Sequence, residues 1–335
     1  MTSARWYCLV GLSALAAVAL FYVARMAEPQ QRPSGAPSFI SPDAELELLV
    51  DGDREDLTFT EGVVVTCDQR ILFSDMPTGK SGERGAILEY HPATRSISVF
   101  RSPSNGANGN RIDRDCNLLT AEHDRLVRTD LATGRAEILI SSDDGGSYQG
   151  LNDIAVDRLG RIYVTHPLYE GQPGRDRDVG VYRIDPDGAV IRVISDAAKP
   201  NGVAICPDQR HIYVGSYDYQ AGSDREMALL QYDLGPDGRA ANRRVLIDYS
   251  PEHGPDGLVC DREGNLWVAV RDERRPGIYA YSVEDGIAAE QAYIPTPQRP
   301  TNLQFGRGDH SSYLYITAGN SLYGIRVGKQ GDHLQ

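Results

Sequence analysis

Four residues with oxygen-bearing side chains stand at matching places along the chain. Glu61, Asn152, Asn201 and Asp256 each lead into a short apolar run, which is followed by a turn and a second apolar run. Two carboxylates and two amide oxygens form a doubly anionic set, the kind of ligand that hard cations prefer. Neither His nor Cys occupies these positions. We therefore expect a site for Ca²⁺, with Zn²⁺, Mn²⁺ or Mg²⁺ as the alternatives.

These leading residues belong to an internal repeat. With Asn108 and Asn302 added, the leads are spaced 44 to 55 residues apart. Each lead unit reads as two antiparallel strands, and a second strand pair with a turn rich in Asp, Pro and Gly follows. A repeat of this length built from short strands is typical of a propeller blade. The sequence therefore predicts an all-β, six-bladed β-propeller with four strands per blade.

The last repeat lacks its outer strand. We expect residues 45–50, which have no hairpin partner of their own, to supply that strand beside residues 322–327 and close the ring. Equivalent loops of a propeller converge on one end of the channel, so the leading residues should become neighbours. As the alternative, each Asn-Gly or Asp-Gly could be an ordinary turn. That alternative does not explain Glu61, because Glu is not a favoured turn residue.

The N-terminal region differs from the repeats. Residues 6–24 are uncharged and mostly apolar, between Arg5 and Arg25, and as a helix would span about 28 Å, close to the thickness of a membrane core. We expect a signal anchor in residues 1–27, a flexible Pro-rich tether in 28–37, the propeller in 38–329 and a polar tail in 330–335. The expected location is a membrane-anchored, exported domain; secretion after signal cleavage is the alternative.

Composition narrows the possible partners. The 335 residues carry 34 Lys and Arg against 47 Asp and Glu, a net charge of −13, and no basic cluster appears. Nucleic acid is therefore not an expected partner. The five cysteines show no C-x-x-C pattern, and we expect those in the repeats to be small apolar residues at strand ends.

Three stretches carry a resemblance to a known family: Pro103–Gly109, Leu119–His123, and Leu151-Asn152-Asp153. With the repeat, they make residues 44–327 resemble the regucalcin (senescence marker protein) and gluconolactonase family of six-bladed, calcium-dependent lactonohydrolases. In that family Glu, Asn, Asn and Asp hold the metal, which implies the same role for the four leading residues. His166 departs from the family, which usually has Asp there.

The resemblance implies hydrolysis of a small-molecule sugar lactone or related cyclic ester. Asp256 is the expected catalytic residue, as general base or as nucleophile. Asn108, His123 and His166 are the expected substrate-binding residues, although a structural, hydrogen-bonded His is the alternative for both histidines. A phosphotriesterase-type or other esterase, a strictosidine-synthase-like protein and a non-catalytic binding platform remain as alternative functions.

Overall fold

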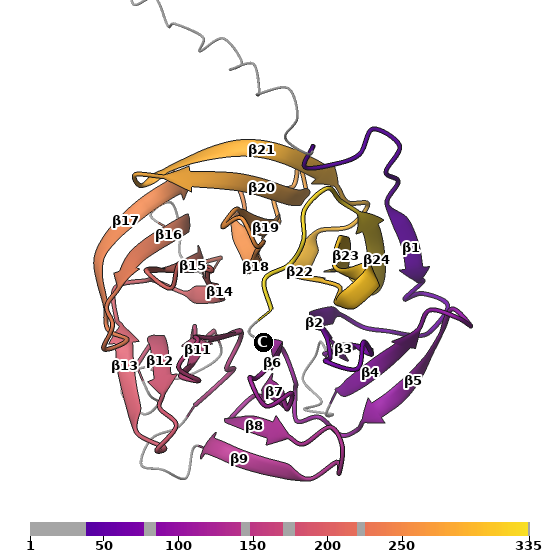
Figure 1. Ribbon diagram of the computed structural model, residues 1–335, viewed down its shortest axis with the longest axis horizontal. Coiled ribbons are helices and arrows are strands. Elements are labelled where there is room, and N and C mark those ends of the chain that lie inside the picture. The colour runs from indigo at the N-terminus through magenta and orange to yellow at the C-terminus, as the bar shows by residue number, and fades with distance from the viewer. Residues whose placement is uncertain (1–37, 77–84, 142–147, 170–177, 220–224, 334–335) are drawn as a thin grey trace, which may run out of the picture. The chain divides into compact units, whose positions relative to one another are not determined.

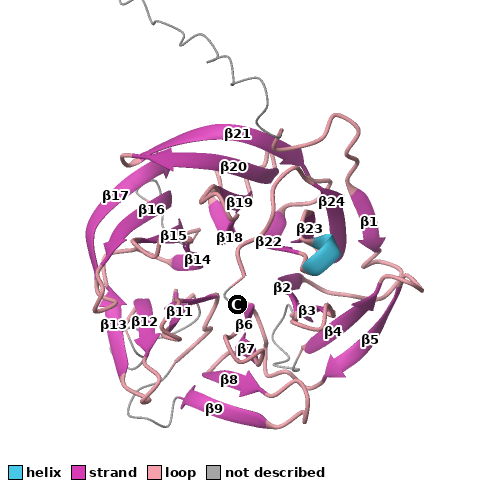
Figure 2. Cartoon of the chain, in the orientation of Figure 1, coloured by secondary structure: helices cyan, strands magenta, loops and turns pink. Residues whose placement is uncertain are grey.

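The computed structural model describes residues 38–76, 85–141, 148–169, 178–219 and 225–333. The predicted anchor (1–27) and tether (28–37) lie outside these ranges. In the part of the chain that is described, no helix is long and apolar enough to cross a membrane. Strands dominate that part, with one short 3₁₀ helix, η1 (Gly308–His310) (Figure 2).

Six antiparallel sheets of four strands surround a central channel (Figure 1), which confirms the predicted propeller. Blade 1 holds β2 (Thr60–Val65), β3 (Ile71–Asp75), β4 (Ala86–His91) and β5 (Ser96–Arg101). Blade 2 holds β6 (Asn110–Ile112), β7 (Leu118–Ala121), β8 (Arg125–Thr129) and β9 (Ala136–Ser141). Blade 3 holds β10 (Ile154–Val156), β11 (Ile162–His166), β12 (Gly180–Ile184) and β13 (Val190–Ile194).

The remaining blades follow the same order from the channel outward. Blade 4 holds β14 (Pro200–Ile205), β15 (His211–Tyr217), β16 (Met227–Leu234) and β17 (Ala240–Asp248). Blade 5 holds β18 (Pro255–Cys260), β19 (Leu266–Val270), β20 (Gly277–Glu284) and β21 (Ile287–Pro295). Blade 6 holds β22 (Pro300–Phe305), β23 (Tyr313–Ala318) and β24 (Ser321–Arg326), and β1 (Glu47–Val50) is its outer strand.

The predicted closure of the ring is confirmed. Strand β1 pairs antiparallel with β24, with Glu47 opposite Gly324 and Val50 opposite Leu322. Both ends of the described chain therefore contribute strands to the same sheet. This pairing covers an edge that would otherwise leave backbone donors and acceptors open.

Aspartates fix the turn between the first two strands of several blades. In blade 5, Asp261 Oδ1 accepts the backbone N–H groups of Glu263 and Asn265, both at 2.9 Å. Asp157 in blade 3 and Asp113 in blade 2 accept equivalent pairs. A carboxylate that satisfies two turn donors favours a tight reversal, which explains why an aspartate recurs at this place in the repeat.

Four cysteines form two disulfides, Cys67–Cys116 and Cys206–Cys260. The expectation that they are unbonded apolar residues is wrong. Each pair is separated by 49 or 54 residues, about one repeat, so its members occupy equivalent turns of adjacent blades. The disulfides therefore join blade 1 to blade 2 and blade 4 to blade 5, at the end of the channel opposite the leading residues.

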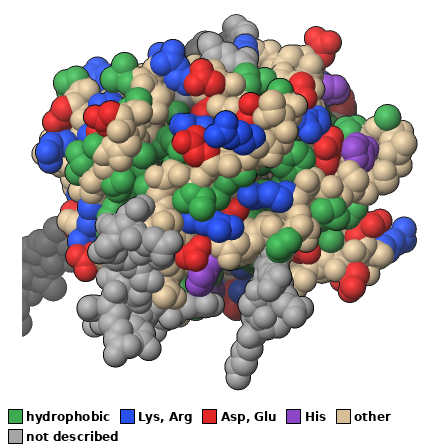
Figure 3. Space-filling model, turned by 90° about the horizontal axis from the view of Figure 1, so that it is seen from below, with side chains coloured by type: hydrophobic (Ala, Val, Ile, Leu, Met, Phe, Trp, Pro, Cys, Tyr) green, Lys and Arg blue, Asp and Glu red, His purple; other side chains and the backbone are tan. Residues whose placement is uncertain are grey.

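Apolar side chains fill the spaces between blades. Trp267 of β19 is fully buried, and its ring meets Phe305 of the next blade edge-on at 5.5 Å. Its indole N–H donates to Asp261 Oδ2 at 3.1 Å. Trp267 thus holds the turn at Asp261 and also packs between blades 5 and 6. On the side of the molecule shown in Figure 3, basic and acidic side chains are intermixed.

The stretch expected to be a polar tail packs against the ring as far as it is described. Gly331 forms an isolated bridge with Asp261, and the Gln330 carbonyl accepts the backbone N–H of Arg262 at 2.8 Å. His333 Nε2 donates to the Gly306 carbonyl at 2.8 Å. The chain therefore crosses the end of the channel that holds the turns, and the last described residues lie near the centre of the ring (Figure 1).

Candidate metal and catalytic site

The leading residues lie at one end of the central channel. Glu61 is on β2, Asn201 on β14 and Asp256 on β18, whereas Asn152 precedes β10 by two residues. All four are buried, with 4% to 7% of their surface exposed. The charge of Asp256 raises the pKa of Glu61, and Asn201 lowers the pKa of Asp256, so side chains of blades 1, 4 and 5 face one another.

The glycines after these residues have a packing role. A Cβ at Gly202 would lie 2.0 Å from the backbone oxygen of Asp256, on the neighbouring blade. At Gly62, where φ is +51°, it would lie 2.2 Å from the backbone oxygen of Asn108. Glycine thus lets the innermost strands approach closely. Because Asn201-Gly202 and Glu61-Gly62 lie within strands, they are not ordinary turn residues.

Two carboxylates are held in this enclosed space. Burial, and then the charge of Asp256, raises the pKa of Glu61 well above its usual range. Burial also raises the pKa of Asp256, and the Arg271 guanidinium opposes part of that shift. One arginine is therefore not enough to keep both carboxylates ionised. A divalent cation is the kind of group that would supply the remaining positive charge.

The amide groups around the carboxylates also fit a cation. Asn201 Nδ2 donates to the Tyr169 hydroxyl at 3.2 Å, which leaves its Oδ1 available to the channel. Asn108 Oδ1 is buried and has no hydrogen-bond partner among the described residues. Buried oxygens of this kind normally accept a hydrogen bond. An unpaired oxygen at this place therefore fits a site for a cation.

The type of metal follows from the donors. Nowhere in the described ranges do three or more His, Cys, Asp or Glu side chains gather closely enough to hold a metal. The candidate set instead combines two carboxylates with the amides of Asn152 and Asn201. A set made only of oxygens, half of them neutral, suits Ca²⁺ better than a metal that prefers His or Cys.

Arg271 is a site residue that the sequence reasoning missed. It follows β19, and its Nη1 lies 2.9 Å from Asp256 Oδ2. Its guanidinium also lies over the rings of Phe59 and Tyr217, 5.4 and 5.7 Å from their centroids. Arg271 lies directly after the second strand of its blade, whereas His166 is the last residue of the second strand of blade 3, so the two positions are not equivalent and the repeat does not indicate Arg271.

Tyrosines form one wall beside the leading residues. Tyr169 and Tyr219 have ring centroids 5.0 Å apart, and Tyr217 lies 5.9 Å from Tyr219. Burial raises the pKa of Tyr169 well above its usual range, so its hydroxyl stays protonated. Lys199 Nζ lies 5.8 Å from the Tyr169 centroid. Sequence reasoning missed this wall, because the tyrosines occupy no fixed place in the repeat. Tyr217 is the last residue of β15, whereas Tyr169 and Tyr219 lie in the loops after β11 and β15.

Asp153 is a third buried carboxyl group near the site. Burial raises its pKa to about 7, while the backbone N–H of Ile154 and the charge of Arg111 oppose the shift. Its charge in turn raises the pKa of Glu61. Asp153 therefore titrates near neutral pH, next to the carboxylate pair.

The remaining predicted residues lie in different surroundings. His166 is fully buried: its Nε2 accepts the backbone N–H of Gln149 at 3.1 Å, and its Nδ1 lies 3.3 Å from the Asp178 carbonyl. Both ring nitrogens are engaged by backbone, as the structural alternative expects. The side chain of His123 is exposed. Of the three expected substrate-binding residues, Asn108 is the one next to Glu61-Gly62.

Comparison with known proteins finds relatives that are named as hydrolases. A gluconolactonase of Zymomonas mobilis is 24% identical over 301 residues, covering 81% of this chain and 79% of its own. The diisopropyl-fluorophosphatase of Loligo vulgaris is 31% identical over 240 residues, covering 66% of this chain and 73% of its own. The solved structure of a gluconolactonase from Xanthomonas campestris, 26% identical, matches with a TM-score of 0.69 and covers 87% of this chain and 94% of its own.

A family profile covers most of the propeller. The profile for the SMP-30/gluconolactonase/LRE-like region matches residues 59–320, which include all six leading residues and Arg271. With this match, the chain belongs to the SMP-30/gluconolactonase/LRE-like family.

Proposed function

We propose that the chain is a calcium-dependent hydrolase of a sugar lactone or related cyclic ester. One observation carries the proposal: Glu61 and Asp256, two buried carboxylates with raised pKa values, share one end of the channel with the amides of Asn152 and Asn201. The similarity to gluconolactonases supports the substrate class.

The metal would be held by Glu61, Asn152, Asn201 and Asp256. A bound Ca²⁺ polarises an ester carbonyl and stabilises negative charge that develops on its oxygen. The residues of the chain then perform the proton transfers. Asp256 would accept a proton from the attacking water and give it to the alkoxide that leaves as the ring C–O bond breaks. Alternatively, Asp256 would attack the carbonyl itself, and water would then protonate the alkoxide and hydrolyse the acyl-enzyme.

Neighbouring residues set the state of Asp256. Arg271 pairs with one of its oxygens and lowers its pKa, which keeps the carboxylate in the basic form that the reaction requires. Asn108 is the proposed contact for substrate hydroxyls, with His123 and His166 as the other proposed substrate-binding residues. The tyrosine wall of Tyr169, Tyr217 and Tyr219 would bound the substrate on the side of blades 3 and 4.

A panel of substrates tests this proposal. Five- and six-membered sugar lactones should be hydrolysed with calcium and left intact after chelation, with activity restored when calcium returns. Hydrolysis of a phosphotriester but of no lactone would favour the second candidate function, which the similarity to diisopropyl-fluorophosphatase supports. Hydrolysis of neither class, with calcium bound, would favour a binding platform.

We also propose that the propeller is exported and anchored by its N-terminal segment. The two disulfides support export, because structural disulfides persist mainly in oxidising compartments. Fractionation of cells, with protease added outside, tests the location: an exported domain is cleaved without lysis and stays with the membrane fraction. A soluble, exported domain would indicate cleavage of the signal.

A further inference from the structure

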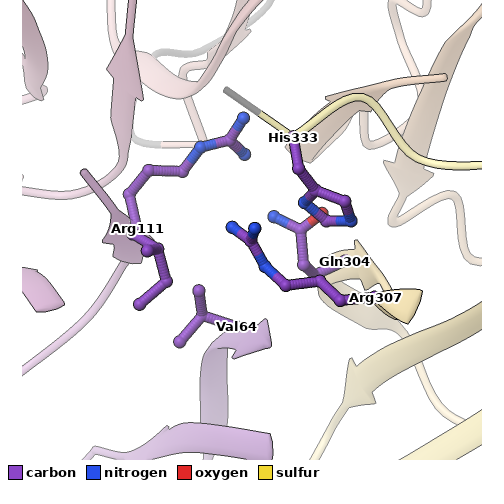
Figure 4. A pocket seen from close by; sticks show the side chains of 6 residues that line it. Val64, Arg111, Gln304, Arg307 and His333 are labelled. Carbon is purple, nitrogen blue, oxygen red and sulfur yellow. The ribbon is translucent and has the colours of Figure 1, made fainter. Parts of the chain in front are cut away.

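A small polar cavity lies in the channel, at the end opposite the leading residues. It has a volume of about 10 Å³ and is lined by Val64, Arg111, Ile112, Gln304, Arg307 and His333 (Figure 4). The two guanidinium groups come from blade 2 and blade 6 and extend toward the same space, with His333 of the C-terminal segment beside them. The cavity thus gathers positive charge from parts of the chain that are far apart in sequence.

The donors around this cavity are incompletely satisfied. Arg307 is 9% exposed; its Nε donates to the Val65 carbonyl at 2.8 Å, but its buried Nη1 has no partner among the described residues. Gln304 Oε1 accepts the backbone N–H of Phe305 at 2.9 Å, which leaves its Nε2 donors for the cavity. A buried guanidinium nitrogen without an acceptor is costly, so an acceptor is expected there.

The charges around the cavity favour an anion as that acceptor. Burial and the charge of Arg111 lower the pKa of Arg307 to about 10. Asp153 and Asp332 act on Arg111, but among the described residues no carboxylate lines the cavity itself. Burial and the neighbouring arginines lower the pKa of His333 to about 3, so its ring is neutral. The lining therefore offers N–H donors and two cations, of which Arg307 has no carboxylate partner among the described residues.

We propose that this cavity binds a small monatomic anion of the chloride class between Arg111 and Arg307. The cavity is small, so a monatomic anion fits it better than sulfate, phosphate or a carboxylate. A bound halide would accept from Arg307 Nη1, Gln304 Nε2 and the Arg111 guanidinium. It would join blade 2 to blade 6 across the channel and so stabilise the closed ring.

Thermal unfolding of the whole protein tests the proposal. At constant ionic strength, replacing isethionate, which is too large for the cavity, by chloride or bromide should raise the Tm by roughly 2–4 °C and then saturate. Arg307→Gln should abolish this halide-dependent rise, whereas Arg239→Gln, at an exposed arginine, should keep it. Because Arg307 also donates to Val65, the variant is judged only by the halide dependence of its Tm, not by its absolute Tm.

A second measurement does not depend on variants. Crystals of the wild-type protein grown in bromide should show an anomalous scattering peak within hydrogen-bond distance of Arg307 Nη1. A Tm that is equal in chloride and isethionate, together with no bromide peak, would overturn the proposal and indicate a buried water. An equal halide effect in Arg307→Gln and wild type would also overturn it, because the anion would then bind elsewhere.

Discussion

Asp256 and Arg271 form a buried ion pair at the mouth of the channel, with 2.9 Å between Oδ2 and Nη1. Glu61, on the other side of the space, has no such cation within contact among the described residues and has a strongly raised pKa. One arginine thus compensates one of two carboxylates. A divalent cation would change the net charge of the three groups from −1 to +1, which would favour negative charge on a substrate carbonyl oxygen.

The first prediction concerns this pair. Arg271→Gln should move the acid limb of the pH profile of kcat/KM upward by about 1 unit or more, because loss of the guanidinium raises the pKa of Asp256. Arg271→Lys should restore part of the shift. Arg54→Gln, at an exposed arginine, is the matched control. An acid limb at the same pH in Arg271→Gln and wild type would show that the pair does not set the charge of Asp256.

The second prediction concerns Asp153 in metal-free protein. Its pKa is about 7 in the fold, against about 4 in an unfolded chain, so the native state holds a proton that the unfolded state releases between these values. Stability should therefore fall as pH rises through this window. Asp153→Asn should flatten the dependence, while Glu55→Gln, at an exposed site, should not. Chemical unfolding at pH 5 and pH 8 with a chelator measures both slopes; equal slopes in all three proteins would contradict the assignment.

The third prediction concerns the disulfides. Replacing Cys206 and Cys260 together by Ala should lower the free energy of unfolding by about 2–5 kcal/mol, because the unfolded chain loses a cross-link. Turnover well below the Tm should be unchanged, since the bond lies at the opposite end of the channel. Reduction of the wild-type protein should lower its stability at least as much. A wild-type protein that is indifferent to reductant would show that the cysteines are unbonded.

The fourth prediction separates the anchor from the ring. Deleting residues 1–37 should leave a folded, active and soluble domain, because every described strand lies after them. Deleting residues 1–50 also removes β1 and exposes β24, so this shorter protein should unfold at lower temperature or associate through the open edge. Size-exclusion chromatography and thermal unfolding compare the two. Aggregation of the longer protein alone would indicate a folding role for the N-terminal segment.

Repetition made the fold predictable from the sequence. Alternating strands, turn aspartates and the spacing of residues such as Glu61 and Asp256 all point to one architecture, and the unpaired strand at residues 45–50 indicates how the ring closes. The leading residues could be found because they occur at one phase of the repeat. The residues around them lack such a pattern, and their roles depend on contacts between blades.

The disulfides and Arg271, which the sequence did not indicate, also depend on contacts between blades. The cysteines occupy equivalent turns of adjacent blades. The repeat that brings the leading residues together therefore also brings Cys206 next to Cys260. In the sequence, nothing distinguishes Arg271 from the many surface arginines. Its role follows from its position after β19 and its contact with Asp256.

Calcium binding and lactone turnover, measured side by side, test the central claim most directly. Calorimetry of wild-type protein should show one calcium ion per propeller. Asp256→Asn keeps the side-chain size and one oxygen ligand but removes the charge and the base, so it should weaken binding and abolish turnover. Asn152→Asp adds a charge, so it should bind calcium at least as tightly yet turn over more slowly, because added negative charge makes the metal a poorer electrophile. Near-UV circular dichroism identical to wild type would confirm that both variants are folded. Full activity in Asp256→Asn, or a wild-type protein that binds no divalent cation, would contradict the account.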